Sequence, residues 1–315
     1  MIDRRSLFAA AGALAAWPAG AKPAPAPPAD LTGAWTNAWY TKLQRPKAFT
    51  ALVATPAEAQ AYETPRRKLR GELSVKEDEL GQNESENPDN GPGLARIGGQ
   101  IRTSWITDPA DGRIPYRPDV PKAVHLDLDT GDYDNVEARD TDERCLTNAS
   151  GAAPLVNSHD ANLIQIVQTP SWVAIVGEKD HEARIVEIAG PGRDPPRRAG
   201  RGSWTGASVG HWEGATLVVE TTDLRPGLTK IGLGLFLSEH SRVTERFTRT
   251  GPTTVAYQFE VSDPTLFTQV WRGEEVFRTA EGLMYEYACH EGNYSLPTIL
   301  RAARAADGKP AASGK

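Results

Sequence analysis

Apolar and polar side chains alternate along the chain from residue 101 onward. Residues 253–262 show the pattern most clearly, because Val255, Tyr257, Phe259 and Val261 fall on one face of a strand. A period of two predicts strands with one buried face. Further strands are expected at 101–107, 122–128, 162–168, 171–178, 183–188, 215–222, 240–250, 265–277 and 283–289.

Short, turn-rich connectors join these strands, among them Thr169-Pro170, Gly251-Pro252 and Asp263-Pro264. Strands this close together can pair only as antiparallel hairpins, because a parallel crossover needs a dozen or more residues. We therefore expect a mostly β fold, an antiparallel up-and-down barrel or curved sheet that is lipocalin-like. Closure of the sheet would remove its exposed edges.

The segment before residue 101 predicts short helices and loops that lie over the barrel. Thr55-Pro56-Ala57-Glu58 is a helix start, with a helix expected to about Glu63. Thr64-Pro65 is expected to break that helix and to begin a second short one through Leu73. Residues 77–93 are rich in Glu, Asp, Asn, Gly and Pro, which predicts an exposed loop.

The first 21 residues have the pattern of an export signal. Arg4-Arg5 precedes the apolar run Leu7 to Trp17, and Ala19-Gly20-Ala21 is an A-x-A cleavage pattern. The arginine pair resembles a twin-arginine signal, and the run is too short to span a bilayer. Residues 22–29 are a Pro/Ala linker, so we expect a periplasmic or secreted protein. The remainder divides into one β-rich domain, 30–304, and a disordered tail, 305–315.

The net charge and the cysteine content restrict the partners and the compartment that we expect for this protein. The 315 residues carry a formal charge of −6, so no broad basic field would attract nucleic acid. No other stretch is apolar enough for a transmembrane helix, and we expect no membrane span. The two cysteines, Cys145 and Cys289, are expected to form a disulfide in an oxidising compartment.

Strand phase singles out Glu245, which shares a face with Val243 and Phe247 and so points to the apolar interior. A carboxylate in that position is costly unless it is paired or takes part in chemistry. One interpretation is a general acid or base whose pKa is shifted by desolvation. The alternative is a buried ion pair, with Arg242, Arg249 or Arg278 as candidate partners.

Three histidines, His181, His240 and His290, fall at the ends of expected strands, where a barrel places its active residues. Tyr285 begins the run Tyr285–Tyr294, in which His290 and Glu291 directly follow Cys289. With Glu245 these side chains form a candidate acid/base cluster. The same cluster could hold a divalent metal, but no H-x-H or H-E-x-x-H spacing supports one, so we expect no cofactor.

Four other residues are candidate substrate-binding groups: Arg184, Asp223, Trp271 and Tyr257. Arg184 would hold an anionic substrate group. Asp223 would add a carboxylate at the rim of the barrel or cap a turn. The two aromatic residues would line a ligand cavity or fill the core.

Four segments resemble a family of exported, β-rich bacterial proteins of unassigned activity: Thr103–Pro115, Gln165–Pro170, His211–Thr222 and Tyr285–Tyr294. The resemblance spans most of residues 30–304. Ala215 stands where the family pattern has Asp, and Asp180-His181-Glu182 stands where it has His-Asp after a more apolar run. The resemblance implies an exported location and a β-rich fold, and it supplies no reaction.

Two functional hypotheses follow. In the first, the protein is an exported barrel enzyme, a lyase, isomerase or hydrolase of a small aromatic, terpenoid or carbohydrate compound. Glu245 would accept the proton, and a histidine or Tyr285 would donate one. In the second, the protein is a periplasmic, lipocalin-like carrier of an apolar small molecule, with Glu245 in an ion pair. An interaction module of the cell envelope is a third alternative.

Overall fold

The computed structural model describes residues 29–79, 91–120, 133, 135–147, 149–157, 162–190, 192, 194, 202–232, 234–280, 282 and 284–308. The export signal, most of the Pro/Ala linker, the expected strand at 122–128 and much of the tail lie outside the described residues.

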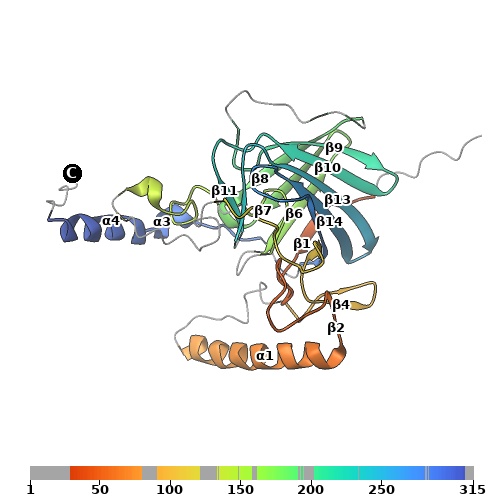
Figure 1. Cartoon of the computed structure of the whole chain (residues 1–315), viewed down its shortest axis with the longest axis horizontal. Coiled ribbons are helices and arrows are strands. Elements are labelled where there is room, and N and C mark those ends of the chain that lie inside the picture. Colours follow the sequence, from red (N-terminus) through yellow and green to blue (C-terminus); the bar gives the residue numbers. More distant parts are fainter. Residues whose placement is uncertain are drawn as a thin grey trace, which may run out of the picture.

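Nine strands close into a barrel (Figure 1). In sheet order they are β1 (Gly33–Thr36), β6 (Leu163–Gln168), β7 (Trp172–Gly177), β8 (Ala183–Ile188), β9 (Ala207–Glu213), β10 (Thr216–Thr222), β13 (Arg242–Gly251), β14 (Thr254–Ser262) and β15 (Trp271–Thr279). The short strand β1 pairs with both β6 and β15 and thereby joins the two edges of the sheet. The expected β barrel is confirmed.

One neighbouring pair departs from the antiparallel expectation. β8 and β9 run parallel, with Val186 opposite Ser208 and Ile188 opposite Gly210. The chain between them covers residues 189–206, which is long enough for a crossover that returns to the starting end of the barrel.

Smaller elements surround the barrel: β2 (Val53–Ala54), β3 (Arg96–Ile97), β4 (Gln100–Arg102), β5 (Ile106–Asp108), β11 (Thr229–Gly232), β12 (Leu235–Leu237), α1 (Pro56–Glu79), α3 (Cys289–Gly292), α4 (Ser295–Ala306) and the 3₁₀ turns η2 (Val136–Ala138) and η3 (Lys179–His181). Two expectations are wrong here. The single strand expected at 101–107 is instead two short strands, β4 and β5. The strand expected at 283–289 is absent from the described residues of this run, which leads into α3.

Helix α1 begins where the sequence predicts. The Thr55 hydroxyl accepts a hydrogen bond from the Glu58 N–H at 3.2 Å, and the Glu58 carboxylate accepts one from the Thr55 N–H at 2.7 Å. The helix nevertheless continues through Pro65 to Glu79, so the expected break is wrong. It lies beneath the barrel in Figure 1 and packs Ala59 and Tyr62 into a small cluster separate from the barrel core.

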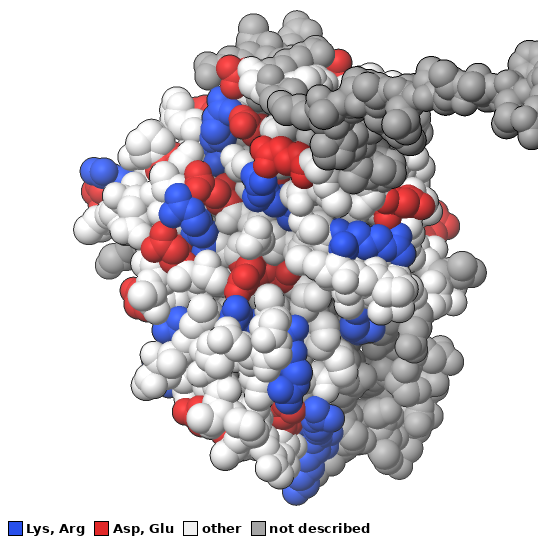
Figure 2. All heavy atoms as spheres, turned by 90° about the vertical axis from the view of Figure 1, so that its right-hand side faces the viewer, with Lys and Arg blue, Asp and Glu red and all other residues white. Residues whose placement is uncertain are grey.

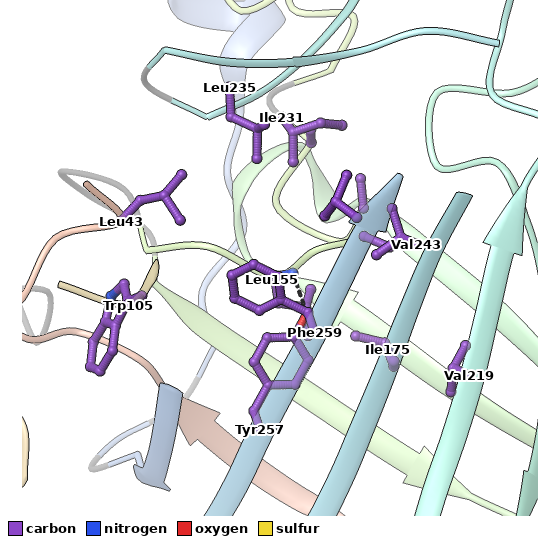
Figure 3. Packing of buried hydrophobic residues seen from close by; sticks show 14 of the residues in the cluster. Leu43, Trp105, Leu155, Ile175, Val219, Ile231, Leu235, Val243, Tyr257 and Phe259 are labelled. Carbon is purple, nitrogen blue, oxygen red and sulfur yellow. Dashed lines mark hydrogen bonds between the residues drawn. The ribbon is translucent and has the colours of Figure 1, made fainter. Parts of the chain in front are cut away.

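The barrel interior is filled by side chains that the strand phase predicts to point inward. Figure 3 shows Ile175, Val219, Val243 and Tyr257 converging from different strands, and each is at most 1% exposed. Segment 149–157 enters this interior from one end, where the Leu155 N–H donates to the Tyr257 hydroxyl at 2.8 Å (Figure 3). Trp271 is also fully buried, so both candidate aromatic residues lie in the core.

Charged side chains of both signs mix on the face of the molecule shown in Figure 2. The outer face of the barrel carries cross-strand ion pairs, including Arg246 with Glu213 and Arg272 with Glu260. Among the described helices, none has the length and apolar character to cross a membrane.

Candidate functional site

Glu245 points into the barrel, as its strand phase predicts, and is fully buried. Its partner is Arg184 on β8. Nη2 of Arg184 donates to Oε1 of Glu245 at 2.8 Å, and Nη1 donates to Oε2. The Tyr257 hydroxyl donates to Oε1 at 2.9 Å. The buried ion pair is therefore the arrangement observed, but with a partner outside the three arginines considered from the sequence.

Arg184 is enclosed on all sides and only 1% exposed. Its Nε donates to the Gly151 carbonyl at 2.9 Å, and Nη1 also donates to the Thr221 hydroxyl at 3.1 Å. Burial by itself would lower the pKa of Arg184, but the charge and hydrogen bonds of Glu245 raise it above the ordinary value. Arg184 presents no exposed edge for an anionic substrate, which corrects the role expected of it.

Tyr257 takes part in the same buried network rather than in a ligand cavity. Burial, followed by the negative charge of Glu245, raises the pKa of its phenol well above the ordinary value. The hydroxyl donates to Glu245 and accepts from Leu155, so its polar capacity is used inside the protein.

Glu275 on β15 is a second buried carboxyl, which the sequence analysis missed. Its Oε2 accepts a hydrogen bond from the Asn37 side chain at 3.1 Å, and its Oε1 has no partner in the described part of the chain. Burial raises the pKa of this carboxyl well above its usual range. The strand phase could have identified Glu275, because it lies on the same buried face of β15 as Trp271 and Phe277.

Two of the three candidate histidines lie near the disulfide. Cys145 and Cys289 are bonded, with Cα atoms 5.7 Å apart, and the expected disulfide is confirmed. It holds α3, which contains His290, against segment 142–147. The preceding run passes the turn η3, where Nε2 of His181 accepts a hydrogen bond from the Tyr287 N–H at 3.4 Å.

Tyr285 contributes its backbone to this arrangement. Its N–H donates to the Glu178 carboxylate at 3.3 Å, and its ring is exposed to solvent. The structure therefore brings together His181, His290 and Tyr285 from the predicted cluster, at the end of the barrel where β7 joins β8.

The turn η3 has strained backbone. Asp180 and His181 are consecutive non-glycine residues in the left-handed region, with φ of 57° and 48°. This conformation is uncommon for such residues and is often found at functional sites. The hairpin is closed by the Gly177 N–H, which donates to the Glu182 carbonyl at 2.9 Å.

Asp180 is the titratable group at the centre of this turn, and sequence reasoning did not single it out. Burial, and then the nearby charge of Asp142, raise the pKa of its carboxyl. The pKa is lowered, to a smaller extent, by the charges of Lys179, His290 and His181. Its Oδ2 is buried and has no hydrogen-bond partner among the described residues.

A groove of about 560 Å³ opens next to this cluster. Tyr287, which is hydrogen-bonded to His181, and Cys289, which precedes His290, line the groove, whereas Asp180, His181 and His290 are not in its described lining. The groove lies between segment 142–145, the run before α3, and the first turns of α4. Its described lining consists of Asp142, Glu143, Cys145, Glu286, Tyr287, Ala288, Cys289, Gly292, Asn293, Ser295, Leu296 and Ile299. We call this groove the disulfide groove.

His240 and Asp223 line a different cavity, of about 350 Å³, with Glu239 and Arg242. Asp223 also has left-handed backbone, with φ of 58°. The structure does not bring these two residues to the disulfide groove, so the predicted cluster divides into a buried ion pair, a disulfide-groove cluster and this second cavity.

In the part of the chain that the structure describes, no group of three or more His, Cys, Asp or Glu side chains has the arrangement of a metal site. No protein-family model matches the chain. A search of curated proteins also found no match. The candidate site therefore rests on its own geometry.

Proposed function

We propose that the protein is an exported enzyme that performs acid/base chemistry on a small molecule bound in the disulfide groove. The observation that carries the proposal is the convergence of Asp180, His181 and His290 beside a groove large enough for a small molecule. The proposed reaction is an elimination, an isomerisation or a hydrolysis, as the sequence suggested. None of these reactions needs a redox cofactor.

The two histidines have different roles in this proposal. Because Nε2 of His181 accepts the Tyr287 N–H, the neutral imidazole carries its proton on Nδ1 and offers this N–H to the substrate as a hydrogen-bond donor. His290 is exposed on α3, next to the lining residue Cys289, and serves as the proton acceptor. The charge of Asp180 acts on His290 and stabilises the imidazolium that forms when His290 accepts a proton.

Glu245 takes no part in the reaction in this proposal. A general base must reach the proton that it abstracts, and the carboxylate of Glu245 is bonded to Arg184 and Tyr257 inside the core. The filled interior also argues against a carrier with an apolar ligand inside the barrel, because large side chains and segment 149–157 occupy that space.

Export supports an extracytoplasmic substrate. The Arg4-Arg5 signal pattern and the disulfide both fit an oxidising compartment. The disulfide forms a wall of the groove, so we infer that the groove reaches its working shape after export or under oxidising conditions.

The test is a turnover screen of the oxidised protein against chromogenic glycosides, aryl esters and small cyclic terpenoids. A substrate found in this way should be turned over about 100-fold or more slowly by His290→Gln, since one general acid or base contributes at least this much. His211→Gln is the matched control, because His211 pairs with Glu213 on β9 and is not among the charged groups that act on Asp180. Full turnover by His290→Gln would refute the assigned role.

A further inference from the structure

One wall of the disulfide groove is acidic. Asp142, Glu143 and Glu286 line it, and its described lining contains no lysine or arginine. Asp142 pairs with Lys179 and Glu143 pairs with Arg139. Both cationic side chains are only 7% exposed, whereas Asp142 is 35% and Glu143 41% exposed. The cations therefore lie behind the wall, and the carboxylate edges face the solvent.

Glu286 adds a carboxylate with no compensating cation. It is exposed, and the described residues give it no hydrogen bond or ion pair. With two paired carboxylates and one unpaired one, the wall carries a net negative charge. An anionic ligand would be repelled from this surface, and a cationic ligand would be attracted to it.

A second part of the lining is apolar. Leu296 and Ile299 of α4 line the groove. Leu300 and Ala303 continue the same helical face at the i+4 and i+7 positions, and all four side chains are half-buried. The half-buried Tyr287 adds an aromatic residue to the lining. Figure 1 shows α3 and α4 extending from the same end of the barrel.

From these two parts of the lining we infer that the disulfide groove binds an organic cation, an ammonium or guanidinium group that carries an aliphatic or aromatic body. The charged end contacts Glu286 and the exposed edges of Asp142 and Glu143. The apolar body packs on Leu296 and Ile299. The groove volume of about 560 Å³ suits a ligand of this size. That such a cation is also the substrate rests on the proposed function.

The test compares three probes that share one apolar tail: n-octylammonium, n-octyl sulfate and n-octyl β-glucoside. Calorimetry is performed on the full, oxidised protein, below the micelle concentration of each probe. We expect n-octylammonium to bind about fivefold more tightly than the glucoside, as one half-exposed charge contact allows. The sulfate should bind more weakly than either, and added salt should reduce the preference for the ammonium.

Two variants locate the site. Glu286→Gln should weaken n-octylammonium binding about fivefold and leave the glucoside unchanged. Glu291→Gln removes an exposed carboxylate of α3 that does not line the groove, so it should leave both affinities unchanged. Equal binding of the three probes, or an unchanged ammonium affinity in Glu286→Gln, overturns the inference.

Binding is measured without turnover, so the two proposals can fail separately. A protein that turns over a compound by way of His290 but lacks the preference for the ammonium overturns only the cation site. A protein that keeps the preference while His290→Gln retains full turnover overturns only the proposed reaction centre.

Discussion

At the scale of single residues, the buried pair of Arg184 and Glu245 has the largest energetic consequence. Both side chains are enclosed, and Tyr257, Thr221 and Gly151 take up further hydrogen-bonding capacity. A pair of this kind contributes modestly as a whole, but the removal of one partner leaves a buried charge without compensation.

Glu245→Gln is therefore expected to lower the free energy of unfolding by about 3–5 kcal/mol. The measurement is urea unfolding at neutral pH. Glu260→Gln is the matched control, because Glu260 pairs with Arg272 on the exposed face, and this variant should change stability by less than about 1 kcal/mol. Near-native stability of Glu245→Gln would contradict the importance of the buried pair.

Glu275 makes stability depend on pH. Its pKa is raised by burial, so between the ordinary carboxyl pKa of 4.5 and the raised value the native protein keeps a proton that the unfolded chain releases. The contribution of this bound proton to the stability of the folded protein is fully present below the ordinary pKa. It is lost as the pH rises toward the raised pKa of the native state.

Glu275→Gln should reduce this loss, because the amide keeps the shape of the protonated carboxyl and cannot ionise. The measurement is the melting temperature from pH 4 to pH 9. Glu182 and Asp180 also have raised pKa values, so part of the slope should remain. A slope equal to that of the native sequence would show that Glu275 is ionised in the folded protein.

At the scale of elements, β15 shows how tightly the strands are fitted. Gly273 faces the ring of Phe259 on β14, and a Cβ built at Gly273 would lie 2.2 Å from that ring. The close approach explains why a glycine interrupts an otherwise regular strand.

Gly273→Val should destabilise the protein by about 1–3 kcal/mol through overpacking. Gly190→Ala is the control, because a Cβ at Gly190 meets nothing within 4 Å. Thermal unfolding of the two variants, measured in parallel, tests the difference. A valine variant as stable as the control would mean that Phe259 can move aside at little cost.

The element predictions succeeded where local patterning decides the structure. The inward faces of β13 and β14 and the capped start of α1 follow from a few neighbouring residues. The expected strand at 283–289 failed for a non-local reason. β15 already pairs with β14, β1 and β5, so the run that follows it meets no free sheet edge.

At the scale of the whole molecule, the disulfide attaches the C-terminal segment to the barrel. Neither α3 nor α4 has a buried residue. Among the described residues, the segment also makes contacts such as the hydrogen bond from the Asn293 side chain to the Glu143 carbonyl at 2.8 Å. Because neither helix buries a residue, we expect the disulfide to contribute much of the order of this segment.

Replacement of both cysteines by serine should therefore raise hydrogen exchange across α3 and α4, while β13 and β14 stay protected. The bond spans 144 residues, so its loss should also lower stability by about 4–5 kcal/mol in the chain-entropy model. The native protein in reductant is the matched comparison and should behave like the double variant. An unchanged melting temperature and unchanged exchange would contradict this role.

The candidate site depended on relations between distant parts of the chain. His181, His290 and Tyr285 were predicted as members of one cluster and do lie near one another. His240 was assigned to the same cluster because it precedes the strand that carries Glu245 and so lies at a strand terminus, yet it lines another cavity. The position of a residue at a strand end can be inferred from the sequence, but its position around the rim of the barrel cannot.

The sequence by itself determined the β class, the inward phase of Glu245 and the disulfide partners, because each depends on local periodicity or on composition. Only the tertiary structure decided that Arg184, 61 residues from Glu245, is its partner, that β8 and β9 run parallel, and that the run before α3 meets η3. Strand periodicity is set by backbone geometry within a few residues, whereas these three relations are set by sheet order and register.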